Sequence, residues 1–314
     1  MTSRFNNDES WAVLSPIEQS IKAKIEAVGR PLRDWDVKIN RGILTGCNDA
    51  FIINQAKRDE LISKDPRSAE IIRPILRGRD IKRYGYDFAN QYLIALFPSR
   101  NYDIDNYTAV RDYLLSAEWS DEIPYGYGKK KLEQTGRKHT INGVVFTARK
   151  LTGNKWFETQ DQINYWDDFS KQKIVWAETM RIHRENIQNF PRFSFCVEQM
   201  FTDKTCFIAI ANKHPHFILG FMNSGIGRYS LKRCVSILDD GGYLCQKVYI
   251  ESILLPNVPT NMIREIENLV LQSLYNENII IRKKMDDLFY RLFGFSRDEI
   301  HFIEEDNIKL FVRR

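Results

Sequence analysis

The clearest candidates for ligand-binding chemistry are the cationic side chains between residues 73 and 84. These are Arg73, Arg77, Arg79, Lys82 and Arg83, and only Asp80 opposes them. Guanidinium groups bind phosphate oxygens through paired hydrogen bonds, and clustered cations gain affinity by displacing the counterions of a polyanion. Gly78 has no side chain, so backbone could approach a ligand closely there. The segment therefore predicts a phosphate-binding surface, with contacts from Arg77, Arg79, Lys82 and Arg83.

The segment from Tyr125 to Trp156 is the most basic stretch of the chain. Glu133 is its only acidic residue, and its cations are Lys129, Lys130, Lys131, Arg137, Lys138, Arg149, Lys150 and Lys155. Aromatic residues lie among them, and flat rings and amides can reach sugars and bases while the cations contact phosphates. We expect nucleic-acid contacts here, although the run 129–131 on its own also fits a solvated lysine face.

The stretch from Thr179 to Pro191 is polar and rich in turn-forming residues. It follows the apolar run KIVWAE, which predicts a strand at residues 173–178. Arginines on loops that leave a sheet can bind base edges in the major groove, and guanine is their usual target. Arg181, His183 and Arg184 are therefore the candidates for base contacts. An ordinary surface loop is the alternative interpretation.

Patterns for other chemistries are weak. Asp167, Asp168 and Lys171 are a crude version of the carboxylates and lysine of a metal-dependent nuclease, but paired aspartates before a strand are more typical of a cap or turn. His214 and His216 would need a third ligand to hold a metal, and the sequence identifies none. We expect no catalytic residue and no metal site in this chain.

An adenine-N6 methyltransferase needs two features that the sequence does not offer. One is a glycine-rich turn after a strand, which holds S-adenosylmethionine, and the other is an Asn/Asp-Pro-Pro-aromatic turn for the flipped base. The chain has no Pro-Pro dipeptide, and Gly220, Gly225 and Gly227 follow a helical pattern instead of a strand. We therefore expect no cofactor on this chain.

Composition indicates a globular protein with its positive charge in the middle of the chain. Its 314 residues are 43% hydrophobic and 28% charged, and the net charge is +5. Residues 1–40 carry six basic and six acidic groups, and residues 261–314 carry nine and ten. Five cysteines form no CxxC pair, which predicts small buried side chains. No apolar run approaches the roughly 18 residues that span a bilayer, so we expect no membrane contact and a cytoplasmic location.

Capping and periodicity predict helices near both ends of the chain. Ser15 and Glu18 form a capping box for a helix over residues 15–28, which Gly29 ends. From residue 259 onward apolar residues recur at helical spacing, which predicts a helical hairpin or coiled-coil-like pair. Ser296 and Glu299 form another capping box before Ile300 and Phe302. Between these helices the pattern predicts a β-hairpin at 41–53, strands at 92–97, 193–197, 205–210 and 246–255, and helices at 56–63, 68–72, 107–117 and 215–223.

Two ordered motifs in residues 41–84 resemble a known family. The first is Gly42-Ile43, Thr45-Gly46, Asn48 and Ala50-Phe51-Ile52-Ile53, and the second is Asp65-Pro66, Ser68, Glu70-Ile71-Ile72, Pro74 and Leu76-Arg77-Gly78-Arg79-Asp80-Ile81. Both are similar to the opening of the TaqI-like C-terminal specificity domain of type IIG restriction-modification enzymes and related adenine-N6 DNA methyltransferases. Residues 149–160, 217–223 and the C-terminal FGFSRDEI are also similar, so the resemblance covers nearly the whole chain.

The resemblance implies an α+β fold: a mixed β-sheet target-recognition domain over residues 1–258, with the lead-in helix 15–28, followed by a helical tail over 259–314. It implies double-stranded DNA as the partner. The implied phosphate contacts are Arg41, Arg77, Arg79, Lys82, Arg83, Arg149, Lys150 and Lys155. The implied base or sugar contacts are Thr45, Asn48, Asn154, Trp156, Arg181, His183 and Arg184.

In the resembled family a methyltransferase domain precedes a helix like that at 15–28, and because the sequence begins just before this helix we expect that domain to be missing. S-adenosylmethionine and Mg²⁺ are therefore expected only on a partner chain or on a missing catalytic domain. Two alternatives remain open. The chain could be a cryptic metal-dependent nuclease that uses Asp168, or an interaction module whose helices at 15–28 and 260–304 dock on a separate methyltransferase or nuclease subunit.

Overall fold

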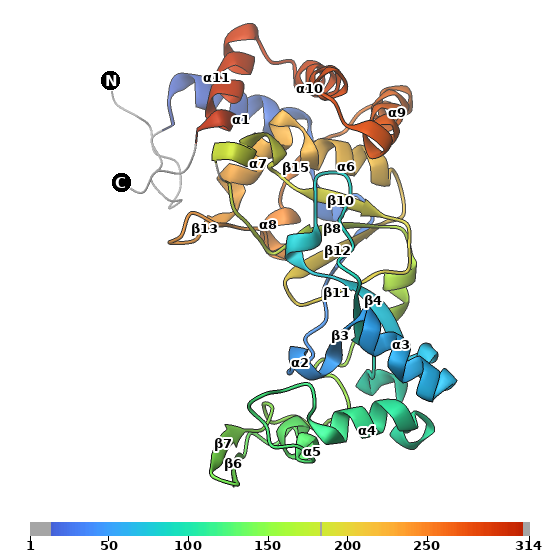
Figure 1. Cartoon of the computed structure of the whole chain (residues 1–314). Coiled ribbons are helices and arrows are strands. Elements are labelled where there is room, and N and C mark those ends of the chain that lie inside the picture. Colours follow the sequence, from blue (N-terminus) through green and yellow to red (C-terminus); the bar gives the residue numbers. More distant parts are fainter. Residues whose placement is uncertain (1–13, 183, 310–314) are drawn as a thin grey trace.

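A four-stranded antiparallel sheet, buried on both faces, lies at the middle of the molecule (Figure 1). The computed structural model describes residues 14–182 and 184–309. The strands lie in the order β10 (Phe193–Cys196), β8 (Lys173–Ala177), β12 (Cys206–Ala211) and β2 (Val37–Arg41). We refer to them as the central sheet.

Successive side chains of the central sheet enter two different hydrophobic cores. Trp176 and Phe207 stack with ring centroids 5.7 Å apart in one core, whereas Val175 and Ile208 belong to the other. A strand that is covered on both faces needs an unbroken apolar run, which KIVWA supplies. Each fully buried side chain of this size contributes roughly 1.5–3 kcal/mol, so the sheet holds the two halves of the molecule together.

The first lobe consists mainly of helices packed on the Trp176 face of the central sheet. Helix α6 (Pro215–Asn223) lies on the sheet, and Phe217 stacks on Trp35 and also contacts Phe289. The other elements of this lobe are α1 (Pro16–Val28), β1 (Gly29–Pro31), η1 (Leu32–Asp34), β9 (Thr179–Met180), η7 (Arg184–Asn189), α7 (Gly225–Cys234), β13 (Ser236–Ile237), β14 (Tyr243–Leu244), α8 (Lys247–Ile250), β15 (Leu254–Pro256), α9 (Thr260–Asn276), α10 (Ile279–Phe293) and α11 (Arg297–Ile308).

The second lobe is built on another four-stranded sheet, which lies on the Val175 side. Its strands lie in the order β11 (Phe201–Thr202), β4 (Ile72–Leu76), β5 (Gln91–Ile94) and β3 (Ile52–Asn54). Phe51, Leu93 and Phe169 are among the fully buried side chains of its core. The remaining elements are α2 (Asn48–Phe51), α3 (Gln55–Lys64), η2 (Pro66–Glu70), η3 (Gly78–Asp80), η4 (Pro98–Arg100), η5 (Ile104–Asn106), α4 (Thr108–Ser116), α5 (Gly128–Leu132), β6 (Lys138–Ile141), β7 (Val144–Thr147) and η6 (Trp166–Ser170).

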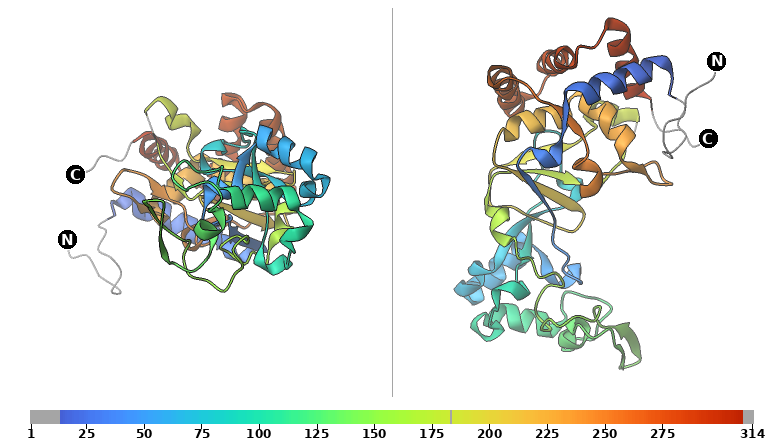
Figure 2. Two further views of the ribbon diagram at one scale, coloured as in Figure 1. Left: turned by 60° about the horizontal axis from the view of Figure 1, so that its bottom comes forward. Right: turned by 180° about the vertical axis from the view of Figure 1, so that it is seen from behind.

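The two lobes lie one above the other, with the central sheet between them (Figures 1 and 2). Helices α1, α9, α10 and α11 are at one end, and the β6–β7 hairpin is at the opposite end. Mixed sheets and a C-terminal helical region confirm the predicted α+β fold class. Within residues 14–182 and 184–309, no helix is both long and apolar enough to cross a membrane.

The predicted N-terminal helix is confirmed as α1. Ser15 and Glu18 make the capping box, and the N–H of Gly29 closes the last turn on the carbonyl of Ile25. The helix docks on α11, where Ser20 and Lys24 each donate a hydrogen bond of 2.6 Å to Glu299. Burial opposes ionisation of Glu299, but these hydrogen bonds outweigh it and lower the pKa of the carboxyl to about 2.

The C-terminal tail contains three helices where the sequence predicted a pair. The third, α11, begins at the predicted capping box of Ser296 and Glu299. Ile263 of α9 and Met285 of α10 lie in the same hydrophobic core as Trp176. The tail is therefore built into the first lobe.

Two other predictions are wrong. The strand before Gly46 and the strand after it do not form a hairpin, because β2 pairs with β12 in the central sheet and β3 pairs with β5 in the second lobe. Residues 48–51 are helical instead. The strand predicted at 246–255 is mostly the helical turn α8, with only β15 extended. In both places the apolar run is short, and a short apolar run does not by itself distinguish a strand from a short helix.

Candidate nucleic-acid interface

The candidate interface lies at one edge of the central sheet. Because neighbouring strands are antiparallel, the end of β8 lies beside the starts of β10 and β12. The chain continues from β8 through β9 to Arg181, and Arg192 immediately precedes β10. Arg192 donates a hydrogen bond of 3.3 Å from Nη1 to the carbonyl oxygen of Arg181. The sheet thus brings together two arginines that are 11 residues apart in the chain.

The turn Arg77-Gly78-Arg79-Asp80 packs against the same edge. The N–H of Gly78 donates a hydrogen bond of 3.0 Å to Thr205 Oγ1, at the start of β12. A Cβ at Gly78 would lie only 3.1 Å from that oxygen and 3.2 Å from Cβ of Ala177. The carboxylate of buried Asp80 accepts a hydrogen bond of 2.8 Å from the N–H of Arg77. The turn therefore fixes its two arginines beside β8.

The chain after this turn runs along the edge strand β10. Tyr84 exchanges backbone hydrogen bonds with Phe193 and Phe195. This places Lys82 and Arg83 near Arg192, which lies just before β10. Arg83 is ion-paired with Glu277, at the junction of α9 and α10. The segment from Arg77 to Arg83 is therefore anchored both to the central sheet and to the helical tail.

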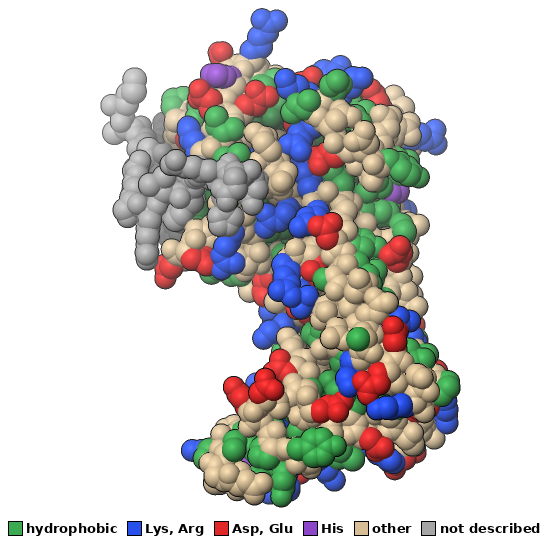
Figure 3. Space-filling model, in the orientation of Figure 1, with side chains coloured by type: hydrophobic (Ala, Val, Ile, Leu, Met, Phe, Trp, Pro, Cys, Tyr) green, Lys and Arg blue, Asp and Glu red, His purple; other side chains and the backbone are tan. Residues whose placement is uncertain are grey.

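Two adjoining hollows of about 610 and 400 Å³ lie between these segments. We call them together the basic groove. Both hollows are lined by Gly78, Arg79, Arg181 and Arg192. Arg77 lines only the larger hollow, and Lys82 and Arg83 line only the smaller one. Figure 3 shows lysine and arginine side chains gathered where the molecule is hollowed between its two lobes.

The cations of the basic groove are only partly neutralised. Exposed Arg79 has no hydrogen-bond or ion-pair partner within the part of the chain that the structure describes. Lys82 forms an exposed ion pair of 3.2 Å with Asp87, and Arg181 is ion-paired with Asp240. Burial lowers the pKa of Arg192 and raises the pKa of Asp203 in the larger hollow. The groove therefore presents at least three accessible cations to a polyanion.

Arg41 lies at the margin of the groove. Its Nη2 atom is 2.7 Å from Oε2 of Glu178, a residue that lines the larger hollow, and its Nε atom donates to the carbonyl oxygen of Lys204. The side chain is exposed. Of the sequence-predicted residues, the structure thus brings Arg41, Arg77, Arg79, Lys82, Arg83 and Arg181 to one region.

A second set of predicted site residues lies in the second lobe, where their side chains bond to other parts of the protein. Arg149 is 4% exposed, and its guanidinium donates to three carbonyl oxygens, those of Leu132, Thr45 and Trp156. Thr45 is fully buried and donates to the side chain of Asn48, which is itself exposed. These bonds join the loop after β2 to the loop after β7. The geometry leaves Arg149 and Thr45 no surface with which to contact DNA.

Asn154 and Trp156 belong to the same loop. The amide of Asn154 donates to the carbonyl oxygens of Thr159 and Gln160, and Trp156 is half-buried. Lys150 and Lys155 are exposed, and Lys155 lies 3.9 Å from Glu158. None of these residues lines the basic groove. The preceding part of the most basic segment forms α5 and the β6–β7 hairpin, which lie at the far end of the second lobe (Figure 1).

The structure assigns no side-chain environment to two of the predicted base contacts, His183 and Arg184. His183 lies outside the described residues, and the described part of Arg184 is its backbone at the start of η7. Sequence reasoning did not single out Arg192, although it lies at the end of the predicted recognition stretch. The sequence feature that could have identified Arg192 is its position between Pro191 and the aromatic residue that begins β10. A cation directly before a strand lies where that strand enters the sheet.

The aspartates considered for a nuclease have a different role. Asp168 is buried, and its carboxylate is held by Lys38 at 2.8 Å, Lys171 at 2.7 Å and Asn40 at 2.9 Å. Burial opposes ionisation, but hydrogen bonds from both lysines outweigh it and lower the pKa of Asp168. Across residues 14–182 and 184–309, no cluster of three or more His, Cys, Asp or Glu could hold a metal ion. Asp168 therefore joins η6 to β2.

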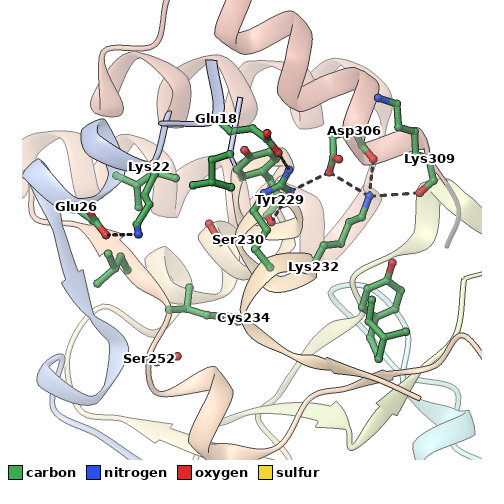
Figure 4. A pocket seen from close by; sticks show the side chains of 17 residues that line it. Glu18, Lys22, Glu26, Tyr229, Ser230, Lys232, Cys234, Ser252, Asp306 and Lys309 are labelled. Atoms are coloured by element: carbon green, nitrogen blue, oxygen red, sulfur yellow. Dashed lines mark hydrogen bonds and ion pairs between the residues drawn. The ribbon is translucent and has the colours of Figure 1, made fainter. Parts of the chain in front are cut away.

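A larger hollow, of about 740 Å³, lies elsewhere, between α1, α7 and the end of α11. Figure 4 shows that Lys22 pairs with Glu26 and Lys232 with Asp306. Arg233 also forms an ion pair with Glu18. Because, among the described residues, all of its charged side chains except Lys309 are ion-paired and the remainder of its lining is largely apolar, it does not resemble a site for a polyanion.

No family model matches the chain, and no match was found among curated proteins. The fold is that of solved restriction-modification enzymes. One is the type IIG restriction endonuclease BpuSI, with a TM-score of 0.54, 14% sequence identity and 93% of this chain covered. Another is the type IIL restriction-modification enzyme MmeI, solved in complex with DNA, with a TM-score of 0.50, 12% identity and 86% of this chain covered.

The matched region is a minor part of both enzymes. This chain covers 32% of the BpuSI chain and 35% of the MmeI chain, so it spans about a third of the length of each. The likeness establishes a fold shared with type IIG and type IIL enzymes over most of this chain.

The buried guanidinium of Arg149 gives the first prediction. Replacing Arg149 with Met should lower the free energy of unfolding by about 2–4 kcal/mol, because three buried carbonyl oxygens lose their donors. Urea denaturation followed by circular dichroism measures this difference. The control is Lys150→Met, which removes an exposed neighbouring cation and should change stability by less than about 0.5 kcal/mol. Equal stability of the Arg149 variant and wild type would contradict the structural role.

Proposed function

We propose that this chain binds double-stranded DNA in a sequence-specific manner, as the specificity part of a restriction-modification system. The observation that carries the proposal is the basic groove, where cations from residues 77–83 and 181–192 converge at the edge of the central sheet. DNA binding proteins draw most of their affinity from such cations, because each neutralised phosphate releases counterions. The fold shared with enzymes that act on DNA supports the same assignment.

The accessible cations of the groove are proposed to hold the DNA backbone. Arg79 and Lys82 are the principal phosphate contacts, with Arg77, Arg83 and Arg192 shaping the groove behind them. Arg41, Lys150 and Lys155 would extend the contact to other phosphates, and Asn48, Asn154 and Trp156 remain proposed contacts to sugars or bases. Arg149 and Thr45 are withdrawn from this set, since both are buried.

The loop that starts at Arg181 is proposed to read base edges. Arg181 is half-exposed and is held by Asp240, with which it forms an ion pair on the surface. An exposed ion pair of this kind contributes roughly 0–1 kcal/mol, so guanine can compete for the guanidinium at little cost. His183 and Arg184 follow directly in sequence and complete the proposed recognition loop.

Catalysis is proposed to belong to another chain or domain, which would bind S-adenosylmethionine and Mg²⁺. In this division residues 1–258 recognise DNA in the cytoplasm and residues 259–314 dock on the catalytic partner, a methyltransferase or nuclease. Exposed apolar side chains at the α9–α10 junction support the docking role. They are Leu271, Tyr275, Ile279 and Ile280, and Tyr275 is 92% exposed. Clustered exposed apolar groups are a common mark of protein interfaces.

Removing two groove cations tests the DNA-binding proposal. The double variant Arg79→Gln/Lys82→Gln should bind every duplex about tenfold or more weakly, and the slope of log affinity against log salt should fall by about two, one for each lost phosphate contact. Fluorescence anisotropy with labelled random duplexes measures both quantities.

The matched control is Lys64→Gln/Arg111→Gln, which removes two cations from α3 and α4, away from the groove (Figure 1). This control should bind like wild type. The proposal fails if both double variants lose the same affinity, or if wild type binds no duplex in a salt-dependent way.

Arg181 tests sequence reading separately. A bound motif is first selected from a random pool with the wild-type chain. Arg181→Ala should then lose about 1–3 kcal/mol of discrimination at one base pair of that motif, while its affinity for unrelated duplexes changes little. Competition binding with singly substituted duplexes measures the effect. Uniform weakening across all substitutions would instead assign Arg181 to the backbone.

Docking is tested by surface changes, because deleting residues 260–314 would also remove core side chains such as Ile263 and Phe289. The variant Tyr275→Ser/Ile280→Ser should keep wild-type stability and DNA affinity but lose co-purification with a methyltransferase chain expressed alongside it. Lys283→Ser, an exposed polar change on α10, is the control and should retain the partner. A partner that remains bound to the double variant rules out this surface.

A further inference from the structure

A small hollow of about 150 Å³ lies behind the basic groove, among α7, α10, α11 and the segment that leads into β10. Arg83 lines both this hollow and the groove. The other charged residues that line it are Arg228, Arg282, Asp286 and Glu304. It is distinct from the apolar hollow of Figure 4, with which it shares no lining residue.

Several buried polar atoms in this hollow have no hydrogen-bond partner within the described residues. Arg228 is 6% exposed, and its Nη1 atom donates to the carbonyl oxygen of Ile187 at 2.8 Å. Its Nε and Nη2 atoms have no partner, and neither has Nε of Arg282 or Oδ1 of Asn307. A buried donor without an acceptor is destabilising, and more so when it is charged. The three donors belong to residues that line one hollow, which indicates an acceptor-rich ligand.

Three arginines, Arg83, Arg228 and Arg282, and two carboxylates, Asp286 and Glu304, line the hollow. Glu277 pairs with both Arg83 and Arg282, at 2.9 Å for the latter. Asp286 accepts the N–H of Gly225 at 2.7 Å, and burial raises the pKa of this carboxyl to about 6. In the described chain Arg228 bonds only to backbone carbonyls, those of Ile187 and Phe190. The guanidinium of Arg228 therefore forms no direct ion pair within the described residues, and Asp306 attracts it only from a distance.

The start of α7 reinforces this positive character. Ser224 is the N-cap of the ten-residue helix, and it lines the hollow together with Gly225. The aligned peptide dipoles of a helix place about half a positive charge at its first turn. The helix start and the guanidinium of Arg228 thus face the same small space.

We propose that this hollow binds a small tetrahedral oxyanion of the phosphate class. A guanidinium has five donors and no acceptor, so Nε and Nη2 of Arg228 require a ligand with at least two acceptor oxygens, which phosphate presents in the spacing of a fork. The site does not depend on the proposed function. Its ligand is free inorganic phosphate or the terminal phosphate of a nucleic acid, which share this chemistry.

A bound oxyanion would act on the wall of the groove. Arg228 holds the carbonyl oxygen of Ile187, and Arg282 holds that of Gln188 at 2.9 Å, so both arginines anchor the segment between Arg181 and Arg192. The anion would bridge Arg282 of α10 to Arg228 and the start of α7. Occupancy of the hollow would therefore stiffen the segment that forms one side of the groove.

Calorimetric titration of the full chain with sodium phosphate and with sodium sulfate, at pH 8 and constant ionic strength, tests the proposal. Wild type should bind both anions at one site. Arg228→Gln should weaken binding by about tenfold or more, since the unpaired fork is lost. Asp286→Asn should strengthen binding severalfold, because the amide can still accept from Gly225 while the ionised carboxylate that repels the anion is gone.

Lys283→Gln removes an exposed cation from α10 and serves as the charge-matched control, with affinity equal to that of wild type. If Arg228→Gln does not fold, the phosphate affinity of Asp286→Asn alone tests the proposal. Absence of binding to wild type, equal binding by all variants, or weaker binding by Asp286→Asn would each overturn the proposal.

A second arm identifies the source of the anion. A duplex with 5′-phosphates is compared with the same duplex bearing 5′-hydroxyl ends. A preference for the phosphorylated duplex that disappears in Arg228→Gln assigns the site to terminal phosphates. Equal affinity for the two duplexes, together with phosphate binding in the first arm, assigns it to free phosphate.

Discussion

The structure depends on a central sheet that is apolar on both faces. Trp176 and Phe207 face one core, and Val175 and Ile208 face the other, so four strands hold two lobes that otherwise share few elements. A sheet buried in this way cannot move relative to either lobe without exposing one of the cores. Its edges are therefore the most rigidly positioned surfaces of the molecule, and the basic groove lies at one of them.

The groove follows from antiparallel pairing. Strand β8 is antiparallel to both β10 and β12, so the end of β8 and the starts of β10 and β12 meet at the same edge of the sheet. Gly78 lets the turn after β4 approach this edge more closely than any other residue would allow. The cations of residues 77–83 and of residues 181–192, about 100 positions apart, become neighbours only because a sheet that neither segment belongs to brings them together.

This explains what the sequence could and could not predict. Helix α1 and the N-terminus of α11 are governed by local capping, so Ser15 with Glu18 and Ser296 with Glu299 were sufficient to predict them. The groove cations of residues 77–83 were predicted from charge density, which can be counted without knowledge of the fold, whereas Arg192 was not singled out. Arg149 was not predictable in this way, because three carbonyl acceptors from separate loops decide its burial. The hairpin at 41–53 failed for a similar reason: β2 and β3 each find a better partner far away in the chain.

The cations of the groove differ in how strongly the protein itself holds them, and this difference separates two tasks. Arg83 is committed to Glu277 and the helical tail, whereas Arg79 has no partner among the described residues. Arg181 is intermediate, since its ion pair with Asp240 is exposed on both sides. A polyanion entering the groove meets Arg79 without any competing interaction, but it must displace Asp240 to engage Arg181. In the proposed DNA complex, phosphates would also repel Asp240, so backbone binding would weaken the ion pair and release Arg181 for a base edge. Under that proposal the local balance of charges would order the two events, with sequence-independent contact preceding sequence reading.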